Sequence, residues 1–521
     1  MATTIAFKGF EHMPRWRPES PTIVASASAM AMCYDKRNNS AKHPYAYFLR
    51  SAINFDYFNP ASGYGDWVPL VSPGLTGAFG AGAGCVFHPT QGPRGTLAAG
   101  ATTSSVTLTT VLPAAVGVNQ LANRGDGLGF IIRICSNTAA ASGKTEERRI
   151  IANTSGTTPI ITLDSPLSFT PASGAIYEIL AGRVFLLSAG TTAAGCWKYY
   201  DIATNSYSAN LSTTTLAVAI GTDTAMVALS EGHTPYDRIP GEGFLLGGAT
   251  SDGKNCIQAS AAGASTVTGG GMPADLQTNE YRNFQVRIVE DTTNPTAVGQ
   301  RRVISSHTSG ATGVFTVAAW AVTPSAVAKF VIENNDDQIH LRTTAAILIY
   351  TYTISTNTWT TNTIAVPVSH GTGVGFEQSF GIQRDAGLNG RHSNLFSFRG
   401  GAVSTLDVLD IAGAATGVWS NAITYGNLNQ TFTAGTSYAY ESATNQGKFL
   451  HLNVSGTNRM LRFDMKNRVM DSGIYLANLQ GVALLGNKLF ISLFIDGTSK
   501  VSRLYQILHT SAQMVSTILP Q

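Results

Sequence analysis

The chain has 521 residues, with 34 Lys and Arg against 31 Asp and Glu, which gives a formal net charge of +3. Charged residues make up only 12% of the chain and hydrophobic residues 44%. This balance excludes an intrinsically disordered chain, and it excludes the strongly basic surface typical of nucleic-acid-binding domains.

The N-terminal region and the cysteines narrow the class further. The first residues are polar and include Lys8, Arg15 and Arg17, so we expect no signal peptide. No apolar run of about 18 residues occurs, so we expect no transmembrane helix. The five cysteines are scattered, without a Cys-x-x-Cys pair, which argues against a disulfide framework and a zinc site. The low charge favours a protein held in a large assembly.

Short runs rich in Val, Ile, Thr, Tyr and Phe recur between clusters of Gly, Asn, Pro and Ser, which predicts β-strands along nearly the whole chain. The clearest, in chain order, are Val106–Leu112, Gly129–Ile134, Arg148–Ala152, Ile160–Leu163 and Arg183–Leu187. The only helix candidates are short, such as Ala114–Asn123. The predicted fold class is therefore all-β.

One repeat unit consists of a strand, an aromatic strand, a polar turn and often a Trp, and it occurs about six times. The cleanest copy runs from Tyr350 to Trp359. Such an antiparallel blade cannot bury both faces alone, so we predict a β-propeller of about six blades, which resembles kelch-like propellers. Thr22–Met32 is the candidate strand that closes the ring on the last blade. A series of unrelated hairpins in a sandwich is the alternative.

A second repeat is longer. Phe130–Ile134 matches Phe284–Ile288, and Arg148–Ile151 matches Arg301–Ile304, at a nearly constant offset of about 154 residues. We therefore predict two homologous small β-domains inserted between early blades. The predicted domains are a closure strand with the first blade at 1–84, the first inserted β-domain at 85–180, the second blade at 181–210, the second inserted β-domain at 211–338, and the remaining blades at 339–521.

The sequence carries no pattern typical of catalysis, so we predict no enzyme, no cofactor and no metal site. Glu146-Glu147 and Asp336-Asp337 are adjacent carboxylate pairs, and neighbours in a strand point to opposite faces. A glycosidase needs two carboxylates across one cleft. A distant pair such as Asp56 and Asp201 leaves that alternative open.

Paired arginines occur in both inserted domains, as Arg148-Arg149 and Arg301-Arg302. They are either structural partners of Glu178 and Glu333 or candidate subunit contacts. Tryptophans also recur at blade positions, where we expect packing anchors, with sugar stacking as the alternative. These are Trp67, Trp197, Trp359 and Trp419.

The segment Arg148–Pro171, with its run Ala152–Pro159, resembles small β-domains of bacteriophage virion proteins. A propeller with β-domains inserted between blades is similar to the nozzle proteins of short-tailed phages. The resemblance implies a ring of identical subunits below the portal and adaptor, which retains DNA before infection and passes it during ejection. It assigns no site residue.

The expected function is therefore that of a structural tail nozzle or tail tube subunit in the virion, made in the host cytoplasm. The expected partners are further copies of the chain in a ring, other tail and portal-adaptor proteins, and DNA that passes without sequence-specific binding. Two alternatives remain: a propeller that binds a receptor or glycan, and a propeller hydrolase.

Overall fold

The structure is a computed structural model of the chain. The segments it describes are residues 16–23, 31–34, 46–49, 51–58, 67–77, 83–365 (without 89, 124–127, 140, 189–192, 215, 217–223, 229–255, 273, 275, 334 and 344–347), 375–379, 394–398, 405–410, 418–424, 437–440, 449–453, 459–464, 469–475, 493–496 and 502–507. No helix in these segments is long and apolar enough to cross a membrane.

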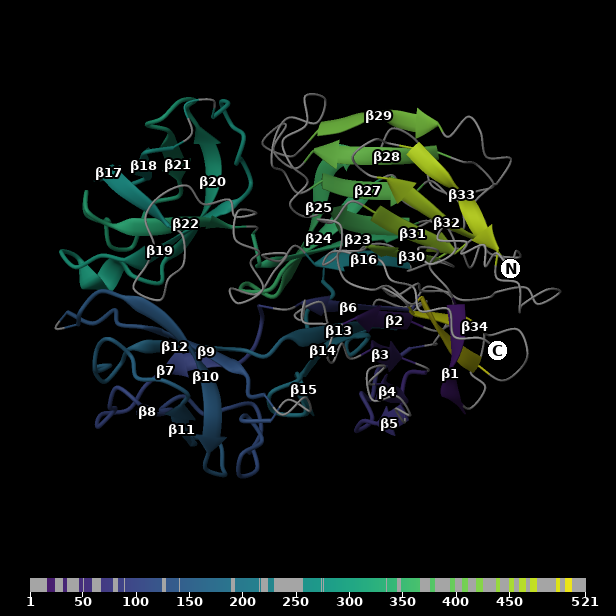
Figure 1. Ribbon diagram of the computed structural model, residues 1–521, viewed down its shortest axis with the longest axis horizontal. Helices are drawn as coiled ribbons and strands as arrows, with labels where there is room; N and C mark the ends of the chain where they lie inside the picture. Colours follow the sequence, from purple (N-terminus) through teal and green to yellow (C-terminus); the bar gives the residue numbers. More distant parts are fainter. Residues whose placement is uncertain are drawn as a thin grey trace, which may run out of the picture.

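The described residues form an all-β, β-propeller-like fold of antiparallel sheets (Figure 1). Five of the sheets have four strands. In each of these sheets, neighbouring strands follow one another along the chain, and in two of the sheets a barrel is inserted after the first strand. The first sheet is β2 (Ala31–Tyr34), β3 (Ala46–Leu49), β4 (Phe55–Phe58) and β5 (Trp67–Pro69), and the second is β6 (Gly84–His88), β13 (Arg183–Leu187), β14 (Trp197–Asp201) and β15 (Ser206–Tyr207).

The third sheet is β16 (Thr224–Ala228), β23 (Gln338–Thr343), β24 (Leu348–Thr353) and β25 (Thr358–Ala365). The fourth is β26 (Gly375–Ser379), β27 (Asn394–Phe398), β28 (Thr405–Asp410) and β29 (Val418–Thr424), and the fifth is β30 (Ser437–Tyr440), β31 (Phe449–Asn453), β32 (Arg459–Asp464) and β33 (Val469–Tyr475). Contacts join β2 to β6, β6 to β16, β16 to β26 and β26 to β30, so the first strands of the five sheets lie side by side in chain order.

The two ends of the described chain share a sixth, three-stranded sheet. In it β1 (Trp16–Ile23) pairs with β35 (Ser502–Ile507), which pairs with β34 (Leu493–Asp496). An N-terminal strand was expected to pair with the last blade, but the strand is 16–23, and Ala31–Tyr34 belongs to the first sheet. Pro18 and Pro21 obscured β1, because proline is tolerated only in strands such as this one at a sheet edge.

The second sheet packs against two neighbouring sheets. Along β13, Val184 and Leu186 pack with Tyr47 and Phe87 on the side of the first sheet. Phe185 and Leu187 instead pack in the cluster that includes residues of the third sheet. Successive strand residues point to opposite faces, so one strand supplies both cores, and this alternation is what stacks the sheets against each other.

The core between the second and third sheets is aromatic. Trp197 is fully buried and stacks on Phe185, with ring centroids 5.5 Å apart. Its ring lies 5.3 Å from that of Trp359 and 5.4 Å from that of Tyr352. Both tryptophans are therefore packing anchors, as predicted; the side chains of Trp67 and Trp419 lie outside the described residues.

Two six-stranded barrels project from the sheets. The first barrel consists of β7 (Arg94–Thr96), β8 (Ser105–Thr107), β9 (Ile131–Cys135), β10 (Thr145–Asn153), β11 (Ile160–Leu163) and β12 (Ile176–Leu180). The second barrel consists of β17 (Ile257–Gly263), β18 (Thr266–Gly270), β19 (Gln285–Glu290), β20 (Arg301–His307), β21 (Val314–Val317) and β22 (Lys329–Glu333).

The barrels have the same architecture. Around the first, the order is β7-β12-β9-β10-β11-β8, and a bridge between Leu97 and Leu108 joins its outer strands. Around the second, the order is β17-β22-β19-β20-β21-β18, which is closed. Each barrel has its own apolar core. This shared strand order is what the longer sequence repeat predicts.

The insertion points differ from the expected ones. The sequence placed each inserted domain between consecutive blades, but β6 pairs with β13 and β16 pairs with β23. Each barrel is therefore inserted between the first and second strands of one sheet, and β6 lies before the first barrel. The repeat unit recognised in the sequence begins at the second strand, which is why the first strand was assigned to the insertion.

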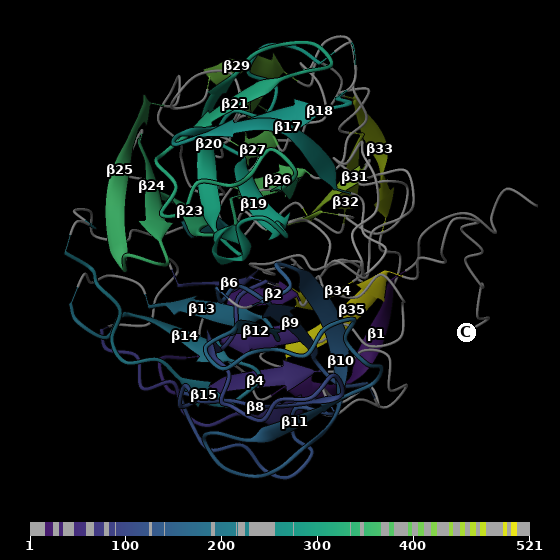
Figure 2. The same cartoon turned by 90° about the vertical axis from the view of Figure 1, so that its left-hand side faces the viewer.

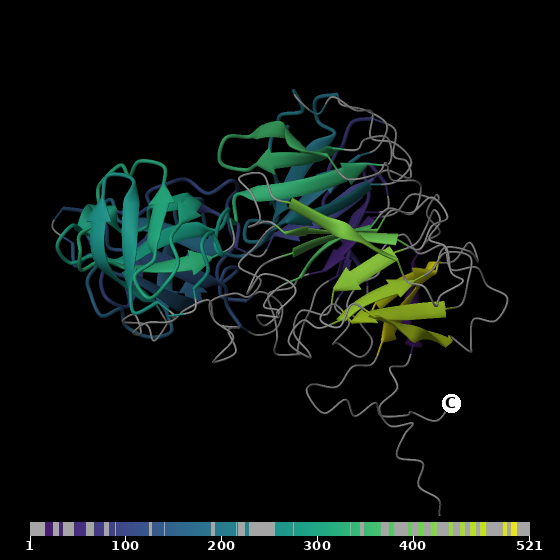
Figure 3. The same ribbon diagram turned by 90° about the horizontal axis from the view of Figure 1, so that it is seen from above.

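Figures 1 and 3 show both barrels together on one side of the sheets. Figure 2 views the molecule from that side, with the barrels one above the other. The expected helix at Ala114–Asn123 is wrong: no helix lies there, Val116 forms a bridge with Gly156, and Asn119 has a positive φ of 58°. The helical element of the described segments is the 3-10 turn η3 (Pro295–Ala297).

Candidate functional site: the buried charged interface between the barrels

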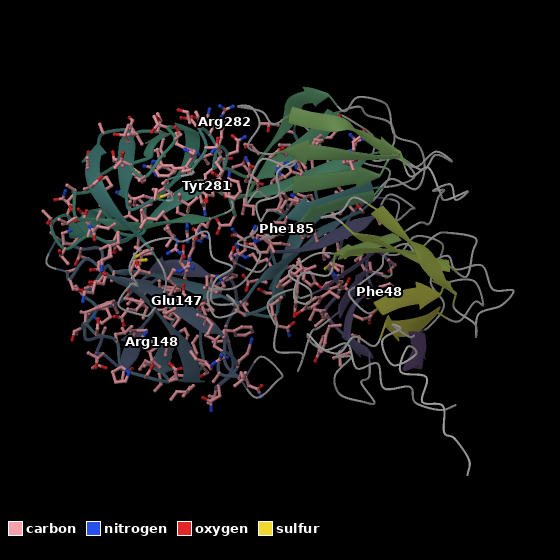
Figure 4. All side chains as sticks on the ribbon, turned by 45° about the horizontal axis from the view of Figure 1, so that its top comes forward. Phe48, Glu147, Arg148, Phe185, Tyr281 and Arg282 are labelled. Carbon is pink, nitrogen blue, oxygen red and sulfur yellow. The ribbon has the colours of Figure 1, made fainter. Side chains whose placement is uncertain are left out.

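Charged side chains gather where the two barrels meet. The residues come from β9, β10 and β12 of the first barrel and from β19, β20 and β22 of the second. Figure 4 labels Glu147 on the first barrel, at the boundary with the second. We treat this interface as the candidate site, because buried charges are costly unless their partners are held in place.

Arg133 is the centre of the first barrel's part. It lies on β9 directly opposite Glu147 of β10 and Glu178 of β12. Its guanidinium donates to the Glu147 carboxylate at 2.8 Å and to Glu178 at 3.0 Å. The Arg133 side chain is 0% exposed. One arginine thus ties three neighbouring strands together on the face that meets the second barrel.

Arg301 of the second barrel completes this cluster from the other side. It donates two hydrogen bonds of 2.7 Å each to the two oxygens of Glu178. Burial would raise the pKa of Glu178, but Arg301, Arg94 and Arg133 outweigh it and hold that pKa well below its usual range. Burial would lower the pKa of Arg301, yet Glu178 holds it well above the usual value. The pair is therefore ionised, and it joins the barrels across 123 residues of sequence.

The second barrel has a parallel arrangement around Arg287. This residue donates to both carboxylate oxygens of Glu333, at 2.9 and 3.1 Å. Glu333 also accepts a hydrogen bond of 2.9 Å from Gln285, whose amide donates in turn to Asp336 at 2.9 Å. All these side chains are buried, so the charges depend on one another for solvation.

Asp336 extends the network to the chain segment that leads into the first barrel. The Thr90 hydroxyl donates to its carboxylate at 3.1 Å, and the Gln91 amide donates to its carbonyl at 2.9 Å. Nearby, burial lowers the pKa of His88 to about 4, although the charge of Asp336 acts in the opposite direction. The segments by which the two barrels join the sheets are therefore bonded to each other.

Close packing surrounds the charges. Cys135 of the first barrel is buried in the apolar core of the second. A Cβ on Gly299 would lie 3.3 Å from the Cys135 sulfur, and a Cβ on Gly143 would lie 2.0 Å from the carbonyl oxygen of Asp291. Both glycines have a positive φ. The two backbones approach too closely at Gly143 for any side chain.

The structure gives each of the four predicted arginines a partner within the chain. Arg148 donates to Glu146 and to the Pro166 carbonyl, and Arg149 donates to the Gly129 carbonyl. Arg302 donates to the carbonyls of Ala319 and Arg301 and lies over the Trp320 ring at 5.6 Å. Of the four, Arg301 alone pairs with the predicted glutamates, with Glu178 at 2.7 Å and with Glu333 at 3.9 Å. That these residues contact another subunit stays a prediction.

The pairing of the strands shows that the sequence repeat was misaligned by one residue at these arginines, where Arg148 had been matched to Arg301. Arg133 stands opposite Glu147, whereas Arg287 stands opposite Arg301. Arg301 is therefore the equivalent of Glu147, and Arg148 that of Arg302. A shift of one residue moves a strand side chain to the other face. The misalignment therefore concealed that the first barrel has a negative charge, Glu147, where the second barrel has a positive charge, Arg301.

Other predicted residues have simple roles. Glu146 and Glu147 do point to different partners: Glu146 binds Arg148 and Ser168, while Glu147 binds Arg133. Asp337 accepts hydrogen bonds from Ser355. Within the described residues no group of His, Cys, Asp or Glu has the arrangement of a metal site.

The sequence analysis missed Arg133 and Arg287 as functional residues. Both occupy the same place in the matched segments Phe130–Ile134 and Phe284–Ile288. An arginine in the middle of an otherwise apolar strand is unusual unless it is paired. That signal, present in both copies, could have identified the interface before the structure.

Comparison with known proteins adds little. No family model matches the chain, and a search of curated proteins finds no significant match. Among solved structures, the Swd1 (Cps50) β-propeller domain of Myceliophteria thermophila is 9% identical and covers 62% of this chain and 93% of its own, with a TM-score of 0.22. A mutant of the NanB sialidase of Streptococcus pneumoniae is 8% identical over 96% of this chain and 98% of its own, with a TM-score of 0.25. Scores this low carry no argument about function.

Proposed function

We propose that the six sheets close into a six-bladed propeller and that the chain is a structural subunit of a bacteriophage tail nozzle or tail tube. The observation that carries the proposal is the pair of barrels, which leave neighbouring sheets and are joined by the Glu178–Arg301 pair. In a closed ring every subunit must meet the next at a fixed angle. Two barrels held by buried bonds to each other and to the sheets provide a rigid body for such contacts.

The arrangement of strands supports the propeller. The first strands of five sheets follow one another in space, and the N-terminal strand β1 pairs with β35 of the last sheet. In propellers, pairing of the two chain ends within one blade is a way to close the ring, and we propose that β1 and β35 do so here. A closed ring is stiff, because each blade is packed on both sides.

The charge of the chain suits passage of DNA. The formal net charge is only +3. Each phosphate that a protein neutralises adds salt-dependent affinity, so a channel lined with many cations would hold DNA instead of letting it pass. We therefore propose a virion location, with further copies of the chain and other tail and portal-adaptor proteins as partners.

Electron microscopy of the purified full-length chain, and of particles that contain it, tests this proposal. We expect closed rings with the paired barrels of one subunit against the next, and the same ring in the tail. Monomers that never enter a particle would contradict it. Binding of single subunits on a glycan array, without ring formation, would favour a receptor-binding module instead.

A further inference from the structure

The two barrels share one fold, so a barrel could in principle pair with a copy of itself from another chain as well as with its sibling. We propose that the interface accepts only the unlike barrel of the same chain and rejects a like barrel from a second copy. The proposal does not depend on the function proposed above. It concerns which residues decide the pairing.

The first argument is charge. If a second copy of the first barrel took the place of the second barrel, Glu147 would stand where Arg301 stands, because each faces the shared arginine of its own barrel. Glu147 would then meet Glu178, where Arg301 now donates two bonds of 2.7 Å. The exchange would remove the Arg301 cation and place a second buried carboxylate beside Glu178, and like charges at such a distance repel. Pairing of two first barrels is therefore disfavoured.

The same exchange in the other direction takes away the main acceptor of Arg301. Val331 occupies the place of Glu178, since it lies opposite Arg287 as Glu178 lies opposite Arg133. In a pair of two second barrels, Arg301 would face Val331, lose both of its 2.7 Å bonds to Glu178 and keep only Glu333 of its own barrel, 3.9 Å away. A largely buried guanidinium that loses its closest partner is strongly destabilising.

The second argument is steric. A Cβ at Gly143 would lie 2.0 Å from the carbonyl oxygen of Asp291. At the repeat offset of about 154 residues, the second barrel has Ala297, which lies in the 3-10 turn η3 and does not share the positive φ of Gly143. A second barrel in the place of the first would therefore lack the glycine that allows this close backbone approach. This steric argument disfavours the same pairing as the charge argument does.

Tethering selects the sibling of the same chain over the sibling of another. The first barrel is joined to β6 and the second to β16, and these two strands are in contact. Thr90 and Gln91 before the first barrel are also bonded to Asp336 after the second. Such tethering raises the effective concentration of the right partner far above that of any free copy.

Isotope mixing tests the pairing within one chain. In a Gly299→Cys variant the new Cβ would lie 3.6 Å from the Cβ of Cys135, close to disulfide geometry. Chains labelled with 14N and 15N are mixed, unfolded and refolded together, then oxidised and digested. We expect disulfides between Cys135 and the introduced cysteine in which both peptides carry the same label, with mixed-label links at least tenfold rarer. Equal amounts of mixed-label links, or Cys135–Cys135 links, would overturn the proposal.

The introduced cysteine must adopt the φ of Gly299, near 87°, which is strained for a residue with a side chain. If that variant does not fold, carbodiimide cross-links between Lys144 and Glu290, whose backbones form a bridge between the barrels, are read for their label pattern in the unaltered chain. Links from Glu290 to Lys329, which lies 3.1 Å away in the same barrel, are counted separately. The expected and contradicting label patterns are unchanged.

Substitutions by the sibling's residue test the selection itself. Arg301→Glu gives the second barrel the charge of the first, and Gly143→Ala gives the first barrel the side chain of the second. In each we expect amide hydrogen exchange in β9, β12, β19 and β22 to rise at least tenfold. The matched controls are Arg302→Glu, whose bonds stay within the second barrel, and Gly100→Ala, which has a positive φ but open space around it. Protection equal to that of the controls would show that these residues do not select the partner.

Discussion

The molecule has two kinds of internal interface, and they are built from opposite chemistry. Between the second and third sheets, Phe185, Trp197 and Trp359 form an aromatic core. Between the barrels, Arg133, Glu178 and Arg301 form a buried ionic cluster. The aromatic interface is stabilised mainly by apolar burial, which is strong and has little directionality. The ionic interface contributes less net free energy but tolerates few alternatives.

This difference in chemistry fits the alternative partners that each interface has to exclude. Neighbouring sheets are consecutive in the chain, so their pairing is decided by connection, and apolar packing is sufficient. The barrels are siblings with the same strand order, and a purely apolar surface would fit either sibling. Charge placed on opposite sides, Glu178 on one barrel and Arg301 on the other, separates the correct pair from the incorrect ones.

The largest effect should come from the aromatic interface. Trp197→Ala removes the side chain around which Phe185, Tyr352 and Trp359 are arranged. We expect the free energy of unfolding to fall by about 4 kcal/mol, measured by denaturant titration. Trp197→Phe fills most of the space and should cost clearly less. A loss below about 1 kcal/mol for the Ala variant would mean that this core is not a main source of stability.

A nearly equal effect should follow from removing the centre of the ionic interface. Arg133→Met keeps the length of the side chain but leaves Glu147 without its arginine. We expect a loss of about 3 kcal/mol, because removing one partner of a buried ion pair is strongly destabilising. Arg287→Met is the matched change in the second barrel, where Glu333 loses its bidentate partner but keeps Gln285 and Arg301. If Arg133→Met were neutral or stabilising, the bonds of Arg133 to Glu147 and Glu178 would not be a main source of stability.

These effects also show how far the sequence could lead. Local pattern predicted several strands within a residue or two, and Ile160–Leu163 and Arg183–Leu187 agree with β11 and β13. Alternation and β-branched composition are local properties, so they are visible in any short window. The prolines of β1 hid one strand, because only its position at a sheet edge makes them tolerable.

The candidate site was less accessible from sequence. The two arginine pairs were recognised in the sequence, but they were aligned one residue out of register. The opposite charges of the equivalent residues Glu147 and Arg301 were therefore not seen. The bond between the barrels joins Glu178 to Arg301, which are 123 residues apart in the sequence. A pair at such a distance cannot be predicted from the spacing of neighbouring residues. The repeat could show that two domains are siblings; only their packing shows which residues distinguish them.

Lowering the pH should separate the contributions of buried histidines and of Glu178 to the free energy of unfolding. Burial lowers the pKa of His88, beside the barrels, and of His340, in the third sheet, to about 4. The unfolded chain therefore takes up these protons first, near pH 6.5, and the native state loses stability as the pH falls from 6.5 toward 4. At pH 5 we expect each histidine to cost about 2 kcal/mol.

Glu178 affects stability in a lower pH range than the histidines do. The pKa of Glu178 is held well below its usual range, so its contribution is complete above about pH 4.3 and is lost only below that value. Stability measured from pH 7 to 3 should fall in two stages. His340→Gln should reduce the first stage by about half, because His88 still contributes, and should leave the second stage unchanged. An unchanged first stage would show that His340 is not a neutral, buried group in the native state.

The smallest effect should come from Arg302, next to the key arginine. Its guanidinium bonds to the carbonyls of Ala319 and Arg301 and lies over Trp320, all within the second barrel. Arg302→Met leaves no carboxylate unpaired, so we expect a loss of about 1 kcal/mol or less, from one cation–π contact and two backbone bonds. Arg301→Met, one position earlier, removes the bond to Glu178 and should cost more, with increased hydrogen exchange in β12. If the two variants cost the same, the interface would depend on total positive charge, and the position of Arg301 would have no special importance.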